Sequence, residues 1–101
     1  MQIALVHSHF DAAHLADVQA TMARLGAPSI RAVDLGEGRW QALEGCHRLR
    51  AAAELGLVPD LVSVEYSDEL LTSLGLDFDG DWTVAQLCDD SYRATWIAFE
   101  D

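Results

Sequence analysis

Four consecutive residues near the middle of the chain could carry chemistry: Gly45, Cys46, His47 and Arg48. They precede an alanine-rich stretch, so they stand where a helix is expected to begin. The first turn of a helix exposes unpaired backbone N–H groups and a partial positive charge, and both attract anions. The glycine lets a ligand approach closely, while His47 and Arg48 can add hydrogen bonds to phosphate oxygens. The pattern therefore predicts a phosphate site at these four residues, which we call the GCHR tetrad.

Two side chains at this position are candidate catalytic groups. The positive field of a helix N-terminus favours the thiolate of Cys46, which would make it a nucleophile. Glu44, directly before the tetrad, is a candidate general base or a carboxylate close to a metal ion. A structural interpretation stays open, in which Gly45 only allows the turn from strand to helix, Cys46 fills apolar space and the arginines are solvated.

The stretch ALEGCHRLRAAAELGL, followed by VPDLVSVEY, resembles the ParB/sulfiredoxin superfamily over about Ile3 to Tyr66. GCHR is the sulfiredoxin signature, and the tetrad matches it residue by residue. The ParB-type pattern of an acid, a glycine, an arginine, an alanine-rich helix, a glycine and a proline falls at Glu44, Gly45, Arg48, Ala51–Ala53, Gly56 and Pro59. The resemblance implies an α/β nucleotide fold in which this helix N-terminus holds the phosphates of ATP or another nucleoside triphosphate with Mg²⁺.

The resemblance implies several activities. Some relatives hydrolyse CTP or ATP, act as nucleases or phosphorylate a small hydroxyl compound, whereas sulfiredoxins use their cysteine to repair a sulfinic acid with ATP and magnesium. In this chain the GCHR tetrad would bind the nucleotide, and Cys46 would be the nucleophile of the sulfiredoxin-like alternative. Glu44 follows the ParB-like members, which favour an acidic residue there, rather than the sulfiredoxins, which usually have a small one.

Composition and charge narrow the classes of partner. The 101 residues are half hydrophobic, which predicts one packed domain. The formal net charge of the chain is −11. Residues 60–101 hold eleven acidic residues and a single basic residue, Arg93. DNA binding is not expected because few basic side chains are available to neutralise phosphates. A non-catalytic interaction module is therefore the alternative function, in which the acidic last third binds a protein partner or a second copy.

The start of the chain does not read as a signal peptide, and no apolar run reaches the length of a membrane span, which predicts a cytoplasmic protein. Hydrophobic periodicity and caps predict the elements around the tetrad. The expected strands are Gln2–His9, Ser29–Leu35, Arg39–Leu43 and Leu61–Tyr66, and the expected helices are 11–26, 45–55, Asp68–Leu74 and one starting near Val84. The end, TWIAFED, fits either a helix tail or a strand. We predict a small α/β domain with a mixed sheet over 1–66 and an acidic helical segment over 67–101 packed on it.

Two further clusters have alternative interpretations. His7 and His9 on one strand face, with Asp11 and His14 nearby, could bind zinc, but an N-cap role for Asp11 is favoured and no metal site is assigned. The turn at 77–81 begins like a calcium loop, yet Cys88 stands where the loop requires glutamate. Cys88 itself could resolve an oxidised Cys46, although a place in the core is favoured.

Overall fold

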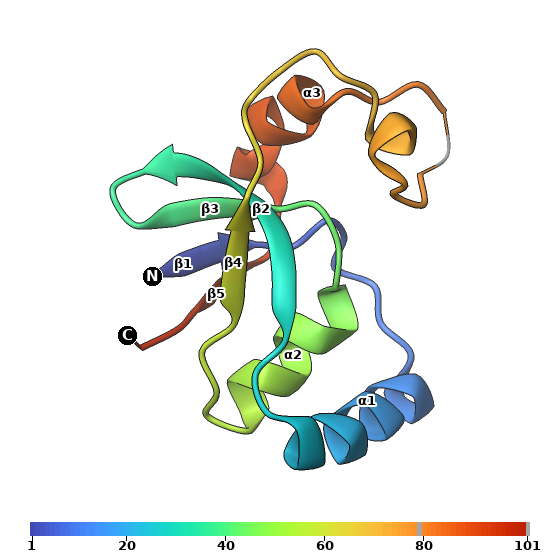
Figure 1. The fold of residues 1–101 in the computed structure, drawn as a ribbon, viewed down its shortest axis with the longest axis vertical. Coiled ribbons are helices and arrows are strands. Elements are labelled where there is room, and N and C mark those ends of the chain that lie inside the picture. The colour runs from blue at the N-terminus through green and yellow to red at the C-terminus, as the bar shows by residue number, and fades with distance from the viewer. Residues whose placement is uncertain (79, 101) are drawn as a thin grey trace.

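A five-stranded mixed sheet with strand order β4-β2-β3-β1-β5 forms the centre of the domain (Figure 1). The computed structural model describes residues 1–78 and 80–100. The hairpin β2–β3 is antiparallel and lies in the middle, β1 and β4 each join it in parallel, and β5 runs antiparallel to β1. The strands are β1 (Gln2–Ala4), β2 (Ser29–Gly36), β3 (Arg39–Ala42), β4 (Asp60–Ser63) and β5 (Trp96–Ala98). With three α-helices, this is the small mixed α/β domain that the sequence predicts.

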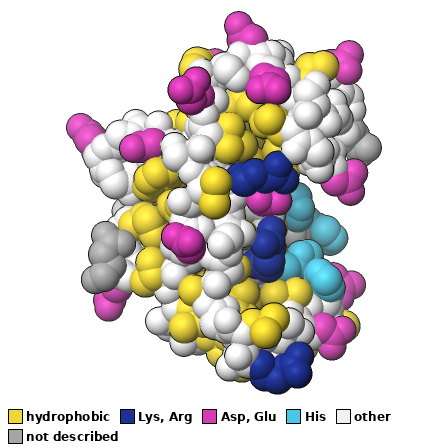
Figure 2. Space-filling view, viewed as in Figure 1, with side chains coloured by type: hydrophobic (Ala, Val, Ile, Leu, Met, Phe, Trp, Pro, Cys, Tyr) yellow, Lys and Arg dark blue, Asp and Glu magenta, His cyan; other side chains and the backbone are white. Residues whose placement is uncertain are grey.

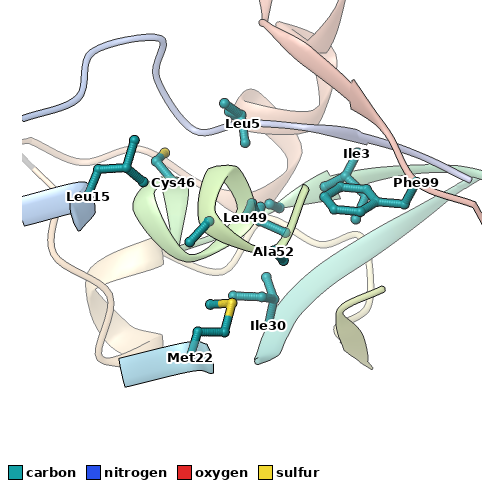
Figure 3. Close-up of a cluster of buried hydrophobic side chains, with 11 residues drawn as sticks. Ile3, Leu5, Leu15, Met22, Ile30, Cys46, Leu49, Ala52 and Phe99 are labelled. Carbon is teal, nitrogen blue, oxygen red and sulfur yellow. The ribbon is translucent and has the colours of Figure 1, made fainter. Parts of the chain in front are cut away.

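Two helices pack against each other and against the sheet (Figure 1). They are α1 (Ala12–Leu25) and α2 (Cys46–Glu54). Asp11 caps α1 as expected, because its carboxylate accepts a hydrogen bond from the His14 N–H at 2.8 Å. Figure 3 shows the cluster that these elements bury, with Leu15 and Met22 from α1 and Leu49 from α2 among its members. The core thus fixes the position at which α2 begins.

The C-terminal third covers another part of the sheet with a second apolar cluster. This third of the chain contains the helix α3 (Val84–Asp89) and two short 3₁₀ helices, η1 (Leu71–Leu74) and η2 (Ser91–Arg93). The predicted capping box at the start of α3 is confirmed: Thr83 and Gln86 exchange hydrogen bonds. Cys88 lies in this cluster, which confirms a place in the core, and burial raises its pKa to about 11.

Several expected boundaries are corrected. The first strand ends at Ala4 rather than His9, because Ala4, opposite Gln41, is the last residue that pairs with β3. The helix expected at 68–74 is reduced to η1. The last third is not only helical, because its end adds the edge strand β5, and Phe99 is buried in the main core. The turn expected at 77–81 includes Asp79, and the chain ends at Asp101; both lie outside the described residues.

Within residues 1–78 and 80–100, no helix combines the length and the hydropathy that a membrane span requires.

Candidate functional site

Gly45 is the residue that shapes the start of α2. Its backbone is left-handed, with φ 78° and ψ 35°, and a Cβ there would lie 2.4 Å from Ile30 Cδ1. Only glycine adopts this conformation and this approach without strain. Gly45 also offers no side chain to cap the helix. In the part of the chain that the structure describes, the N–H groups of Cys46, His47 and Arg48 therefore have no acceptor, as expected for an anion site.

The residues that carry these N–H groups line a cleft of about 610 Å³. Its lining comes from four parts of the chain: the loop after β1 (Val6, His7), α1 (His14, Val18), residues 43–48 and residues 75–78. The structure thus brings Glu44 and the whole tetrad to one surface. In Figure 2, histidine side chains gather beside arginine side chains on the face shown. The cleft is large enough for several functional groups of one ligand.

Glu44 is held by two arginines. Arg31 donates from Nε and Nη2 to the two carboxylate oxygens, at 2.9 and 3.1 Å, and its backbone N–H donates at 3.1 Å. Arg48 Nη2 lies 3.6 Å from Oε1. The hydrogen bonds from Arg31 are the main reason that the pKa of Glu44 is lowered, and they outweigh partial burial. A carboxylate held in this way is a weak base, so the geometry favours a positioning role over general base catalysis.

Arg48 is placed at the cleft by contacts at two of its nitrogens. Its Nη1 donates to the Ser29 carbonyl oxygen at 3.1 Å, and Nη2 faces Glu44. Its side chain is still 40% exposed and lines the cleft. A guanidinium has five N–H donors, so several are left to bind an anion. The guanidinium of Arg48 is therefore held in position and still has unused N–H donors. Phosphate recognition requires both properties.

His47 joins the start of α1 to the start of α2. Its Nε2 accepts a hydrogen bond from the Asp11 N–H at 2.9 Å, so the ring is neutral and carries its proton on Nδ1. The His14 ring meets it edge to face, with centroids 4.5 Å apart. Desolvation, followed by the charges of His14 and His7, lowers the pKa of His47. The ring can therefore donate to a ligand only through Nδ1.

The pH dependence of folding tests this arrangement. A protonated His47 cannot accept from Asp11, and the folded state has the lower pKa, so the unfolded chain takes up the proton first. We expect full stability above about pH 6.5 and a falling melting temperature as the pH drops through the lower pKa of the folded state. Melting curves between about pH 8 and pH 5 measure this.

The control for this experiment is His47→Gln, which keeps an acceptor but cannot titrate. Its melting temperature should fall less over the same pH range than that of the unchanged protein. Equal slopes for the two proteins would contradict the role of His47.

Cys46 is buried with 5% of its surface exposed. It packs in the main core, and Figure 3 shows its side chain beside Leu15. It also contributes to the wall of the cleft. A nucleophilic thiolate needs access to its substrate and solvation of its charge, and both are restricted here. The geometry therefore favours a packing role for Cys46.

The histidines near the N-terminus are arranged differently from the expectation. His7 and His9 are not on a strand, because β1 ends at Ala4. His7 and His14 line the cleft, whereas His9 does not. Over residues 1–78 and 80–100, no group of three His, Cys, Asp or Glu side chains is placed to hold a metal ion. Two features of the site could not be predicted from the sequence, because no local pattern indicates them. They are the contact between the His14 and His47 rings and the cleft wall formed by residues 75–78.

Comparison with protein-family models, curated proteins and solved structures finds no match to this chain. The basis for a functional assignment is therefore the chemistry of the cleft itself. That chemistry consists of an uncapped helix N-terminus, a fixed and exposed arginine, and a neutral histidine that lines the same cleft.

Proposed function

We propose that the protein binds a phosphorylated ligand of the nucleotide class, ATP or another nucleoside triphosphate with Mg²⁺, in the cleft above α2. One observation carries the proposal: three main-chain N–H groups that have no acceptor among the described residues lie beside Arg48, at a cleft of about 610 Å³. A phosphate would satisfy these donors and the helix dipole together. The resemblance of the GCHR tetrad to the ParB/sulfiredoxin superfamily supports the same ligand class.

Each residue of the tetrad has a defined part in this proposal. Gly45 adopts the left-handed backbone and the close approach to Ile30 that let α2 begin at the cleft. The N–H groups of the first turn donate to it, and Arg48 adds the donors that Ser29 does not use. His47 adds the N–H at Nδ1. Glu44 orients Arg48 and does not itself contact the ligand.

The residues present fit a magnesium nucleotide in one respect. Magnesium is usually held by the phosphates and by one or two carboxylates. Among the described residues that line the cleft, Glu44 and Asp77 carry carboxylates, and only Asp77 makes no ion pair with an arginine. Asp77 would therefore hold the metal, which would neutralise charge on the phosphates.

Binding is proposed ahead of turnover. Hydrolysis or phosphoryl transfer needs a base or a positioned nucleophile. Glu44 is held by arginines, and Cys46 is 5% exposed, so neither is prepared for that step. Sulfiredoxin-like repair by Cys46 is accordingly not favoured. Nucleotide hydrolysis and phosphoryl transfer are the activities to assay once binding is established.

Thermal unfolding with ligands tests the proposal. We expect Mg²⁺ with one of ATP, ADP, CTP or GTP to raise the melting temperature, since a ligand at about 100 times its Kd adds about 2.7 kcal/mol to stability. Arg48→Ala should remove most of this increase, measured against its own unliganded melting temperature. The lost charge-assisted hydrogen bonds correspond to about tenfold or more in affinity.

The matched control is Arg24→Ala, which removes the same charge from the last turn of α1, away from the cleft. It should keep the nucleotide-induced increase. An increase of the same size in the Arg48→Ala variant, or none with any of the four nucleotides, would contradict the proposal.

A further inference from the structure

Gln41 is a buried polar residue in the middle strand β3, and its surface is 0% exposed. Its Nε2 donates to the carbonyl oxygens of Ala4 and Ala42, at 3.3 and 2.9 Å. Its Oε1 has no donor in the part of the chain that the structure describes. A buried carbonyl oxygen without a partner costs free energy, so its presence calls for a donor that comes from outside the chain.

Gln41 lines a small pocket of about 190 Å³, which shares only Val6 with the cleft above α2 among the described lining residues. Its apolar walls include Leu5 and Leu87, and its lining also includes Trp82, Asp90 and Arg93. The volume is too small for a nucleotide and suits a slender group that ends in N–H donors. An ordinary apolar core would not place an unpaired amide oxygen at such a position.

Trp82 is held at this pocket by its backbone. Its carbonyl oxygen accepts from the Leu71 N–H at 2.9 Å, and the next residue, Thr83, pairs with Leu70 and caps α3. The indole is 40% exposed. The backbone of Trp82 is therefore fixed at the pocket, and its partly exposed side chain is available to a ligand.

A second hollow of about 450 Å³ shares Trp82 and Asp90 with the first. It is also lined by Asp81 and Asp89, so three carboxylates line this hollow together with Trp82. Asp89 in addition accepts from the Tyr66 hydroxyl at 2.9 Å. Arg93 is the single basic residue that lines either hollow among the described residues. The two hollows together carry negative charge around an aromatic ring and an unpaired acceptor.

We propose that these two hollows form a binding site for an organic cation, a guanidinium or ammonium group on an alkyl stem. Its N–H groups supply the donor that Gln41 Oε1 lacks. The indole of Trp82 attracts the positive charge through a cation–π contact, and the aspartates attract it over longer distance. Leu5 and Leu87 accommodate the stem, as apolar surface does for lysine and arginine side chains. The net negative charge of the two hollows, from three aspartates against Arg93, disfavours a phosphate or carboxylate ligand.

Two sources can supply this chemistry: a free alkyl amine, or an arginine side chain of a partner protein. Each probe is titrated into the full chain. Binding is measured by isothermal titration calorimetry and by changes in the NMR signals of the tryptophan indoles and glutamine amides. The probes are agmatine, N-acetyl-arginine amide and a capped Gly-Gly-Arg-Gly-Gly peptide. N-acetyl-citrulline amide, which has the same shape without the charge, is the neutral comparison.

We expect at least one cationic probe to bind, to shift the Trp82 indole and Gln41 amide signals, and to bind more tightly than the citrulline compound. If agmatine binds most tightly, the natural ligand is a free alkyl amine. If the peptide binds most tightly, the natural ligand is an arginine side chain of a partner protein. Either result supports the cation site. Failure of all three cationic probes, or equal binding of the citrulline compound, would overturn it.

Variants locate the site. Trp82→Leu should weaken binding about tenfold, whereas Tyr92→Leu, at an aromatic residue that is 77% exposed and lines neither hollow, should not. Gln41→Met should weaken binding of the arginine and citrulline compounds alike, because both carry N–H donors for Gln41 Oε1, while the chain stays folded since the change removes an unpaired buried acceptor. Arg93→Gln should tighten binding of the cations. Unchanged affinity of the Trp82→Leu variant for the cationic probes would overturn the assignment. The melting temperature of this variant should still rise with nucleotide as in the unchanged protein, because Trp82 does not line the cleft above α2.

Discussion

Replacing Gly45 with alanine is expected to lower the free energy of unfolding by about 3 kcal/mol, which is a large fraction of the stability of a small domain. Two causes act together. The left-handed backbone at φ 78° disfavours any L side chain, and the new Cβ would lie 2.4 Å from Ile30 Cδ1. The contact cannot be relieved by solvent, because Ile30 is fully buried in the main core. Urea unfolding of the two proteins measures the difference.

The chain offers a matched control at the other end of the same helix. Gly56 is also left-handed, with φ 70°, but a Cβ there would meet nothing within 4 Å. Gly56→Ala should therefore cost only about 1 kcal/mol, the conformational part of the effect. Adding Ile30→Val to Gly45→Ala removes the Cδ1 atom and should restore part of the lost stability. If the two glycine variants were equally destabilised, steric contact with Ile30 would play no part.

The sequence predicts those features that depend on neighbours along the chain. The N-caps at Asp11 and Thr83 and the start of α2 after Gly45 all follow from local backbone chemistry, and the structure confirms them. Strand ends are different, because they depend on partners distant in sequence. Gln2–His9 has the composition of a longer strand, yet pairing with β3 stops at Ala4.

The C-terminal strand shows the same limit. Local pattern leaves TWIAFED undecided between helix and strand, and β5 forms because β1 offers a free edge. The termini then bond to each other, as the Phe99 N–H donates to the Met1 carbonyl oxygen at 2.8 Å. No window of the sequence contains both residues, so periodicity cannot predict the contact.

The candidate site divides in the same way. The GCHR tetrad is contiguous, so its place at a helix N-terminus could be predicted. Its surroundings are tertiary: Arg31 reaches Glu44 from the neighbouring strand, and His14 reaches His47 from the other helix. The hydrogen bonds from Arg31 alter the expected role of Glu44, because they convert a candidate base into a held carboxylate.

Glu44→Gln separates a positioning role from a catalytic one. The amide keeps the shape of the side chain but loses its charge and one acceptor oxygen, so the bonds from Arg31 weaken and Arg48 loses its ion pair. We expect a loss of about 2 kcal/mol in the free energy of unfolding, below the value for a fully buried pair because both side chains are partly exposed. A residue that acts only as a base would leave this free energy unchanged.

The pH dependence of the same pair gives an independent measurement. The folded pKa of Glu44 is lowered, so its contribution is complete above the ordinary glutamate value of about 4.3 and is lost as the pH falls through the folded pKa. The difference in unfolding free energy between the unchanged protein and Glu44→Gln should therefore shrink in acid. Glu65→Gln, at an exposed glutamate, is the control and should change stability little at any pH. A difference independent of pH would show that the charge of Glu44 does not hold Arg31, and the assignment of Arg48 as a positioned phosphate ligand would lose its main structural support.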